Sequence, residues 1–136
     1  MNKKQAEKMI ETIEARQQQQ IGATVSVLAP AFITAVSQMA DQVAEAMAIK
    51  GFWQSDNTGE KIALMHSELS EALEADRKDI EADDKVPEFS GLEAELADTV
   101  IRILDFAGHH ELRLGEAIIA KTLYNLTRPP KHGKAY

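Results

Sequence analysis

The sequence predicts an all-α protein that forms a single domain over residues 1–136. Apolar residues recur at spacings of three and four along most of the chain, as in helices with one buried face. No stretch alternates apolar and polar residues over the length of a strand, and no Asn-Gly or Asp-Gly hairpin turn occurs. We therefore expect a bundle of four main helices plus an N-terminal helix.

The N-terminal part of the chain predicts two helices with a break between them. Residues 3–20 favour a weakly amphipathic helix, and we interpret residues 1–25 as a peripheral helix or arm. The pattern is then interrupted, and Pro30 is tolerated only near the start of a helix. A second helix is expected over residues 31–50, with Gly51 at its end. The interrupting residues are Gly22, Thr24 and Ser26.

Two capping signals mark the next two helices. Asn57 with Glu60 and Ser90 with Glu93 have the spacing of a capping box, in which each residue's side chain bonds the other's backbone N–H. The acidic, Pro-containing stretch between these helices indicates a loop. Gly108 is the expected C-terminal stop of the second of them.

Each of these two helices carries a pair of acidic residues three positions apart, which places both carboxylates on one side of the helix. The first helix has its apolar stripe at Ile62, Met65, Leu69, Ala72 and Leu73, with Glu68 at the margin and Glu71 beyond it. The second has Glu95 at the edge of its apolar arc and Asp98 one step further out. Carboxylates that line a groove between helices suit Mg²⁺, which prefers oxygen ligands.

A solvated acidic face is the alternative interpretation of these pairs. The chain has 22 Asp and Glu residues, so such pairs also arise by chance. A partner four residues away, as in Asp98 and Arg102, would then stabilise the helix.

The C-terminal part of the chain is basic. A last helix is expected over residues 114–126, and Lys121, Asn125 and Arg128 fall on one face. They form either a grip for phosphate or a set of cations that complements the helix dipole. Residues 127–136, which include Lys131, have the composition of a basic tail.

Trp53 is the only tryptophan, and it precedes the first acidic helix. By default it packs in the core or in an oligomer contact. The alternative is stacking against a nucleobase.

Composition excludes several classes of protein. The net charge of −7 argues against non-specific binding to nucleic acid or to an anionic membrane. The chain has no cysteine, no continuous apolar run of membrane-spanning length and no apolar segment after the charged N-terminus. We therefore expect a cytoplasmic protein. No P-loop, dinucleotide fingerprint, His-Glu-x-x-His motif or EF-hand is present.

In combination, these motifs resemble those of the MazG-like all-α nucleoside triphosphate pyrophosphohydrolases. The resemblance lies in the two acidic pairs, separated by 23 residues, and in the ending Lys121-x-x-x-Asn125-x-x-Arg128-Pro129-x-Lys131-His132-Gly133-Lys134. It covers most of residues 51–134 and is closest to the compact single-domain members. One departure is Ser67, where many members carry a further glutamate.

The resemblance implies hydrolysis of a (deoxy)nucleoside triphosphate to the monophosphate and pyrophosphate, with Mg²⁺ or Mn²⁺ as cofactor. Glu68, Glu71, Glu95 and Asp98 would be the metal ligands and catalytic residues. Lys121, Asn125, Arg128, Lys131 and Trp53 would bind the substrate. The resemblance further implies a homo-oligomer, dimer or tetramer. Two alternatives stay open: a related pyrophosphohydrolase acting on phosphoribosyl-ATP or on dUTP and dCTP, and a non-catalytic helical nucleotide-binding or regulatory module.

Overall fold

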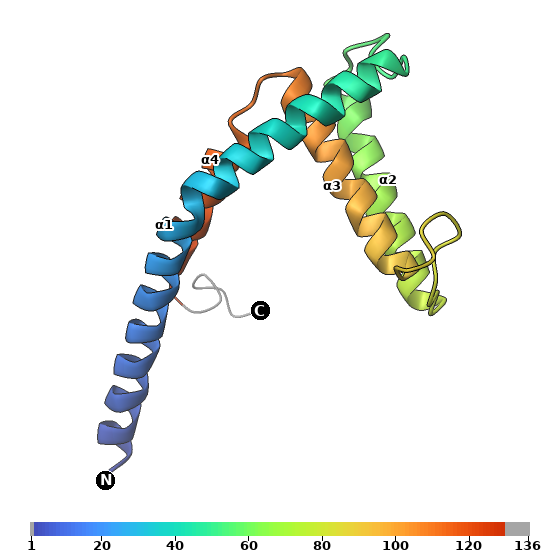
Figure 1. Cartoon of the computed structure of the whole chain (residues 1–136). Helices are drawn as coiled ribbons and strands as arrows, with labels where there is room; N and C mark the ends of the chain where they lie inside the picture. Colours follow the sequence, from blue (N-terminus) through green and yellow to red (C-terminus); the bar gives the residue numbers. More distant parts are fainter. Residues whose placement is uncertain (1, 130–136) are drawn as a thin grey trace. The chain divides into compact units, whose positions relative to one another are not determined.

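The structure is a computed structural model that describes residues 2–129, and within this range it is all-α, as predicted. It contains four helices and no strand across these residues (Figure 1): α1 (Lys3–Ile49), α2 (Thr58–Arg77), α3 (Gly91–His109) and α4 (Leu114–Leu126). The chain divides into two compact units. One combines the chain up to Val36 with the chain from Arg113 onward, and the other runs from Ser37 to Leu112. The expectation of one domain over residues 1–136 stays a prediction.

The expected break between residues 20 and 31 was wrong, because α1 is one helix of 47 residues. Thr24 and Ser26, which were predicted to interrupt the helix, instead form hydrogen bonds within it through their hydroxyls. Thr24 donates to the carbonyl of Gln20 at 3.1 Å, and Ser26 donates to that of Gly22 at 2.9 Å. Pro30 lies inside the helix and removes one N–H donor. Cooperative helix formation on both sides outweighs this local cost.

α1 also contains a stretch that the sequence analysis did not detect. One window of 18 residues has a mean hydropathy of 1.5 and no more than two charged residues, so α1 is long and apolar enough to cross a membrane. Scattered Gly, Ser and Thr residues hid this window from a search for continuous apolar residues. None of this window is buried within the described residues. A buried core helix and an N-terminal signal sequence pass the same test, so length and composition alone are weak evidence for a membrane span.

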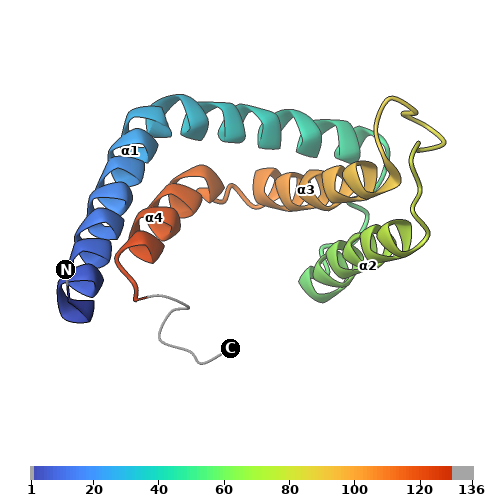
Figure 2. The same cartoon turned by 90° about the horizontal axis from the view of Figure 1, so that it is seen from below.

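In the first unit, α4 runs antiparallel along α1 (Figure 2). A Cβ added to Gly115 would lie 3.0 Å from the Cα of Ile33, and one added to Gly22 would lie 3.7 Å from a Cδ of Leu126. The backbones of the two helices therefore approach closely at the start of α4. Much of the apolar surface of α1 in this unit is exposed, including Met9, Ile10, Ile13, Ile21, Val27, Leu28 and Phe32.

In the second unit, α2 and α3 form the most extensive helix pair. The capping box that opens α3 is confirmed, because the Glu93 N–H donates to the Ser90 hydroxyl and Glu93 accepts from the Ser90 N–H in return. At the start of α2, Asn57 is the N-cap and accepts from the Glu60 N–H at 3.2 Å. The reciprocal bond of a capping box is not formed between these two described residues.

Gly108 was expected to be the C-terminal stop of α3. This is wrong, because the helix continues to His109 and has His110 as its C-cap. The residue has a packing role instead. A Cβ at this position would overlap the backbone carbonyl of Ala40 and would lie 2.8 Å from the Cβ of Ala44. A glycine therefore allows α3 to approach α1 closely within this unit.

The buried face of α2 also differs from the expected apolar stripe. Glu68, Ala72 and Ala75 are the buried residues of α2, at relative positions i, i+4 and i+7. Leu69 and Leu73 remain 46% and 50% exposed. The buried part of α2 thus consists of one glutamate and two alanines, whereas Leu64 and Met65 are half-buried and the larger apolar residues of the predicted stripe are otherwise exposed.

Candidate functional site

Three carboxylates from two helices converge in the second unit. Glu68 and Glu71 on α2 and Glu95 on α3 each offer an oxygen, and these oxygens all lie within 4.8 Å of one another. The i, i+3 spacing on α2 brings the first two to one side, and the antiparallel pairing of α2 with α3 adds the third. The fourth predicted residue, Asp98, lies outside this group but one helical turn beyond Glu95 on α3.

The electrostatics of the cluster appear most clearly at Glu95. Partial burial raises the pKa of its carboxyl, and the charges of Glu71, Asp98 and Glu68 raise it further. The charges of the other three acidic residues therefore all act on Glu95. A divalent cation at this position would offset their mutual repulsion.

The cation next to the cluster is Arg102 on α3. Its Nε donates to Oε1 of Glu68 at 2.5 Å, and Glu68 itself is only 7% exposed. The alternative interpretation of the acidic pairs placed Arg102 beside Asp98 along the helix, but the bond forms across the two helices instead. Arg102 thus balances the most buried carboxylate of the cluster.

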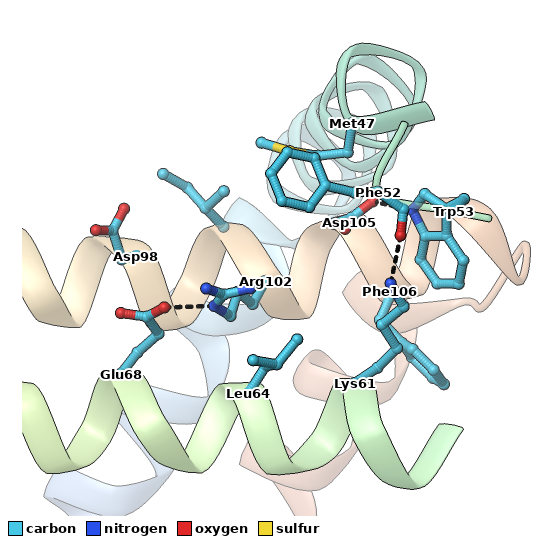
Figure 3. A pocket seen from close by; sticks show the side chains of 11 residues that line it. Met47, Phe52, Trp53, Lys61, Leu64, Glu68, Asp98, Arg102, Asp105 and Phe106 are labelled. Carbon is cyan, nitrogen blue, oxygen red and sulfur yellow. Dashed lines mark hydrogen bonds and ion pairs between the residues drawn. The ribbon is translucent and has the colours of Figure 1, made fainter. Parts of the chain in front are cut away.

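A pocket of about 180 Å³ opens beside the cluster (Figure 3). Its polar side carries Glu68, Asp98 and Arg102. Its other side is mainly apolar and aromatic and includes Met47, Phe52, Trp53, Leu64, Ile101 and Phe106. An apolar wall next to a few convergent charged groups is typical of a small-molecule site.

Trp53 is held firmly in this pocket wall. Its Nε1 donates to Asp105 at 2.7 Å, and its ring stacks on His109 with a centroid distance of 3.5 Å and an angle of 6°. The Lys61 ammonium lies over the ring, 4.3 Å from the centroid. A stacked ring and a cation at these distances must occupy opposite faces of the indole. A nucleobase that stacks on Trp53 must therefore displace one of them.

The predicted phosphate-binding residues lie in the first unit. Lys121 and Asn125 are exposed on α4, and Arg128 follows its C-terminus. The Lys121 ammonium lies 5.5 Å from the ring centroid of Tyr124. Lys131 is outside the described residues. The role of all four in substrate binding stays a prediction.

Sequence reasoning missed several residues of the pocket and its surroundings. Lys61 donates to the carbonyl of Phe52 at 2.6 Å and closes the loop against α2. Asp105 lies four residues before His109 on the same helix, and that spacing could have indicated a common face. The adjacent histidines at the end of α3, His109 and His110, were likewise not predicted as site residues.

Comparison of the chain with known protein families, with curated proteins and with solved structures finds no match. The fold and the site define a class in coarse terms only: an all-α protein with a cluster of carboxylates between two antiparallel helices. A more specific function must be inferred from the chemistry of that cluster and of the pocket beside it.

Proposed function

We propose that the chain is a Mg²⁺-dependent nucleoside triphosphate pyrophosphohydrolase of the MazG-like all-α kind, which hydrolyses a (deoxy)nucleoside triphosphate to the monophosphate and pyrophosphate. One observation carries this proposal: the oxygens of Glu68, Glu71 and Glu95 lie within 4.8 Å of one another. The adjoining pocket, with aromatic residues in its wall, supports a substrate that combines phosphate groups with a planar base.

The donor set fits a hard divalent cation. Every ligand atom is a carboxylate oxygen, the type that Mg²⁺ and Mn²⁺ prefer. Burial raises the pKa of Glu95, the charges of Glu71, Asp98 and Glu68 raise it further, and a bound dication would offset both effects. Bound Mg²⁺ would neutralise phosphate oxygens as charge develops on them. Glu68, Glu71, Glu95 and Asp98 are the proposed ligands, and one of these carboxylates would act as the base that orients a water molecule.

Arg102 is proposed to contact the phosphate groups. Its guanidinium lies in the pocket and at present pairs with Glu68. When Glu68 turns toward a cation, the guanidinium becomes free for phosphate oxygens, which match its planar array of donors. Lys121, Asn125, Arg128 and Lys131 are proposed to neutralise the leaving pyrophosphate.

The base is proposed to bind at the aromatic wall of the pocket. Phe52 is 55% exposed and offers a free surface next to Trp53. Trp53 itself accepts a base only after Lys61 or His109 moves away, since both faces of its ring are covered. Stacking on aromatic rings tolerates different bases, because every base has a π-face.

We also propose that the chain is a cytoplasmic homo-oligomer, either a dimer or a tetramer, that binds neither nucleic acid nor membrane. The exposed apolar residues Ile62, Leu69 and Leu73 of α2 support a contact with a second copy. The apolar window of α1 would be covered in the same way. Analytical ultracentrifugation without detergent tests this: a single dimeric or tetrameric species is expected, and a chain that stays dispersed only in detergent contradicts it.

The second candidate is a non-catalytic nucleotide-binding or regulatory module. The observation that favours it is the bond between Arg102 and Glu68, which neutralises a proposed ligand with a protein cation. Within the enzymatic proposal, phosphoribosyl-ATP, dUTP and dCTP are alternative substrates.

Pyrophosphate release across a panel of ribo- and deoxynucleoside triphosphates, with and without Mg²⁺, separates these functions. We expect Mg²⁺-dependent release from at least one triphosphate, and a loss of roughly 100-fold or more in Glu71→Gln. Glu74→Gln is the matched control, because Glu74 lies on the same helix but pairs with Lys78 outside the cluster. If the wild-type chain releases no pyrophosphate with Mg²⁺ or Mn²⁺, the enzymatic proposal is wrong.

A further inference from the structure

A second group of potential metal ligands lies at the other end of the α2–α3 pair. His109 and His110 end α3, and Asp56 belongs to the loop that precedes α2. Each of the three offers one ligand atom, and these atoms lie within 4.8 Å of one another. We propose that Asp56, His109 and His110 form a binding site for a divalent transition metal ion such as Zn²⁺, separate from the acidic cluster.

The strongest support comes from His110. Its Nε2 atom is buried and has no hydrogen-bond partner among the described residues. The Oδ1 atom of Asp56 lies 3.2 Å away, but not in a direction that makes a hydrogen bond. Zn²⁺ holds its ligands at about 2.0–2.2 Å in a tetrahedron, which puts neighbouring ligand atoms about 3.4 Å apart. The separation of these two atoms is thus close to that of two ligands on one ion.

The two imidazole rings are oriented by aromatic packing. The His109 ring stacks on Trp53, and the His110 ring lies 4.3 Å from the ring of Phe106. The two histidine rings are nearly perpendicular to each other, at 84° and with a centroid distance of 5.1 Å. Ligands that packing holds in place lose less conformational freedom when they bind an ion.

The donor types distinguish this site from the acidic cluster. Two imidazoles and one carboxylate suit Zn²⁺ and Co²⁺, whereas Mg²⁺ prefers oxygen ligands alone. Three protein ligands leave one tetrahedral position for water. An ion here would join the loop before α2 to the end of α3, and Trp53 lies in that loop. The metal would therefore fasten the aromatic wall of the pocket.

Titration with Zn²⁺ or Co²⁺ tests the proposal, because Trp53 is the only tryptophan and stacks on a proposed ligand. We expect Trp53 emission to change on titration with either ion, and Co²⁺ to give the intense visible absorption of a tetrahedral site. In Asp56→Asn and His110→Ala the affinity should fall by roughly 10-fold or more. Asp56 has an exposed side chain, so its substitution leaves the fold intact.

His66→Ala is the matched control, since it removes an exposed imidazole of α2 from outside the site. It should bind both ions like the wild-type chain. Glu71→Gln should do so as well, which separates this proposal from the proposed hydrolase function. If Asp56→Asn and His110→Ala bind both ions with the same affinity and the same Co²⁺ spectrum as the wild-type chain, or if the wild-type chain gives neither response, the proposal is wrong.

Discussion

The two ends of the α2–α3 pair are built in opposite ways. At the acidic end, Glu68, Glu71 and Glu95 face one another, and Arg102 bonds one of them. At the aromatic end, the Trp53 ring stacks on that of His109, and its Nε1 donates to Asp105. His110 lies near the carboxylate of Asp56. The acidic end stores electrostatic repulsion, whereas the aromatic end is held by packing. Substitutions at the aromatic end should therefore change stability most, and those at the acidic end should change the response to cations.

The largest loss of stability is expected from Gly108→Ala. The added methyl group would overlap the carbonyl of Ala40, and this overpacking should lower the free energy of unfolding by about 1–3 kcal/mol or more. Gly22→Ala is the control, because its nearest neighbour would be a flexible side chain at 3.7 Å. That change should instead add about 0.5–1 kcal/mol through helix propensity. Thermal denaturation of both variants measures this difference. If both substitutions raise the stability, or both lower it by the same amount, the packing described for Gly108 is contradicted.

A smaller loss is expected from Trp53→Phe. The substitution keeps an aromatic ring between Lys61 and His109 but removes the part-buried hydrogen bond to Asp105, at a cost of about 0.5–1.5 kcal/mol. Asp105→Asn still offers an oxygen acceptor to the indole and should cost less. Urea denaturation compares the two variants. A loss in Asp105→Asn that equals or exceeds the loss in Trp53→Phe would show that this hydrogen bond does not stabilise the aromatic end.

Arg102→Met tests the acidic end. Without Arg102, the buried carboxylate of Glu68 loses its partner, and stability without added Mg²⁺ should fall by about 1 kcal/mol, because the guanidinium is partly solvated. Added Mg²⁺ should then stabilise this variant more than it stabilises the wild-type chain. Lys78→Met removes a cation from an exposed pair and is the control. If Mg²⁺ stabilises Arg102→Met no more than it stabilises the wild-type chain, then Arg102 and the cation do not compete for Glu68.

The smallest effect is expected at Glu95 and depends on pH. Because the pKa of Glu95 is raised in the folded protein, the folded state holds its proton more tightly than the unfolded chain does. The stability due to this group is present below its unfolded pKa and is lost as the pH rises through the folded pKa. Glu95→Gln should therefore match the wild-type chain at acidic pH and exceed its melting temperature at neutral pH.

Glu93→Gln provides the opposite sign on the same helix. The Ser90 hydroxyl and N–H donate to the Glu93 carboxylate and lower its pKa, so its contribution is present above the unfolded pKa and is lost as the pH falls. This variant should be less stable than the wild-type chain at neutral pH. Melting temperatures measured across a pH series test both predictions. If Glu95→Gln and Glu93→Gln both melt above the wild-type chain at neutral pH, this account is contradicted.

The sequence was sufficient for features that depend on local chemistry. The all-α class, the bounds of α4 and the capping box of Ser90 and Glu93 were predicted and are confirmed. Helical periodicity and caps act over a few residues, so they can be read without knowledge of the tertiary structure.

Features that depend on contacts between helices were not predictable in the same way. Gly108 looks like a helix stop in the sequence, but its role is set by Ala40, 68 residues earlier. Arg102 bonds across to Glu68 rather than along α3, and Asp56 lies far in sequence from the histidines it approaches. The continuity of α1 through Pro30 was missed because cooperative helix formation outweighs a local penalty.

The proposed cation site between α2 and α3 is tested most directly by the melting temperature as Mg²⁺ is added, since a ligand of the folded state stabilises it. The melting temperature of the wild-type chain and of Glu74→Gln should rise with Mg²⁺ concentration, and that of Glu71→Gln should not. A wild-type melting temperature that does not change with Mg²⁺, or a rise of the same size in Glu71→Gln, would contradict a cation site formed by these carboxylates.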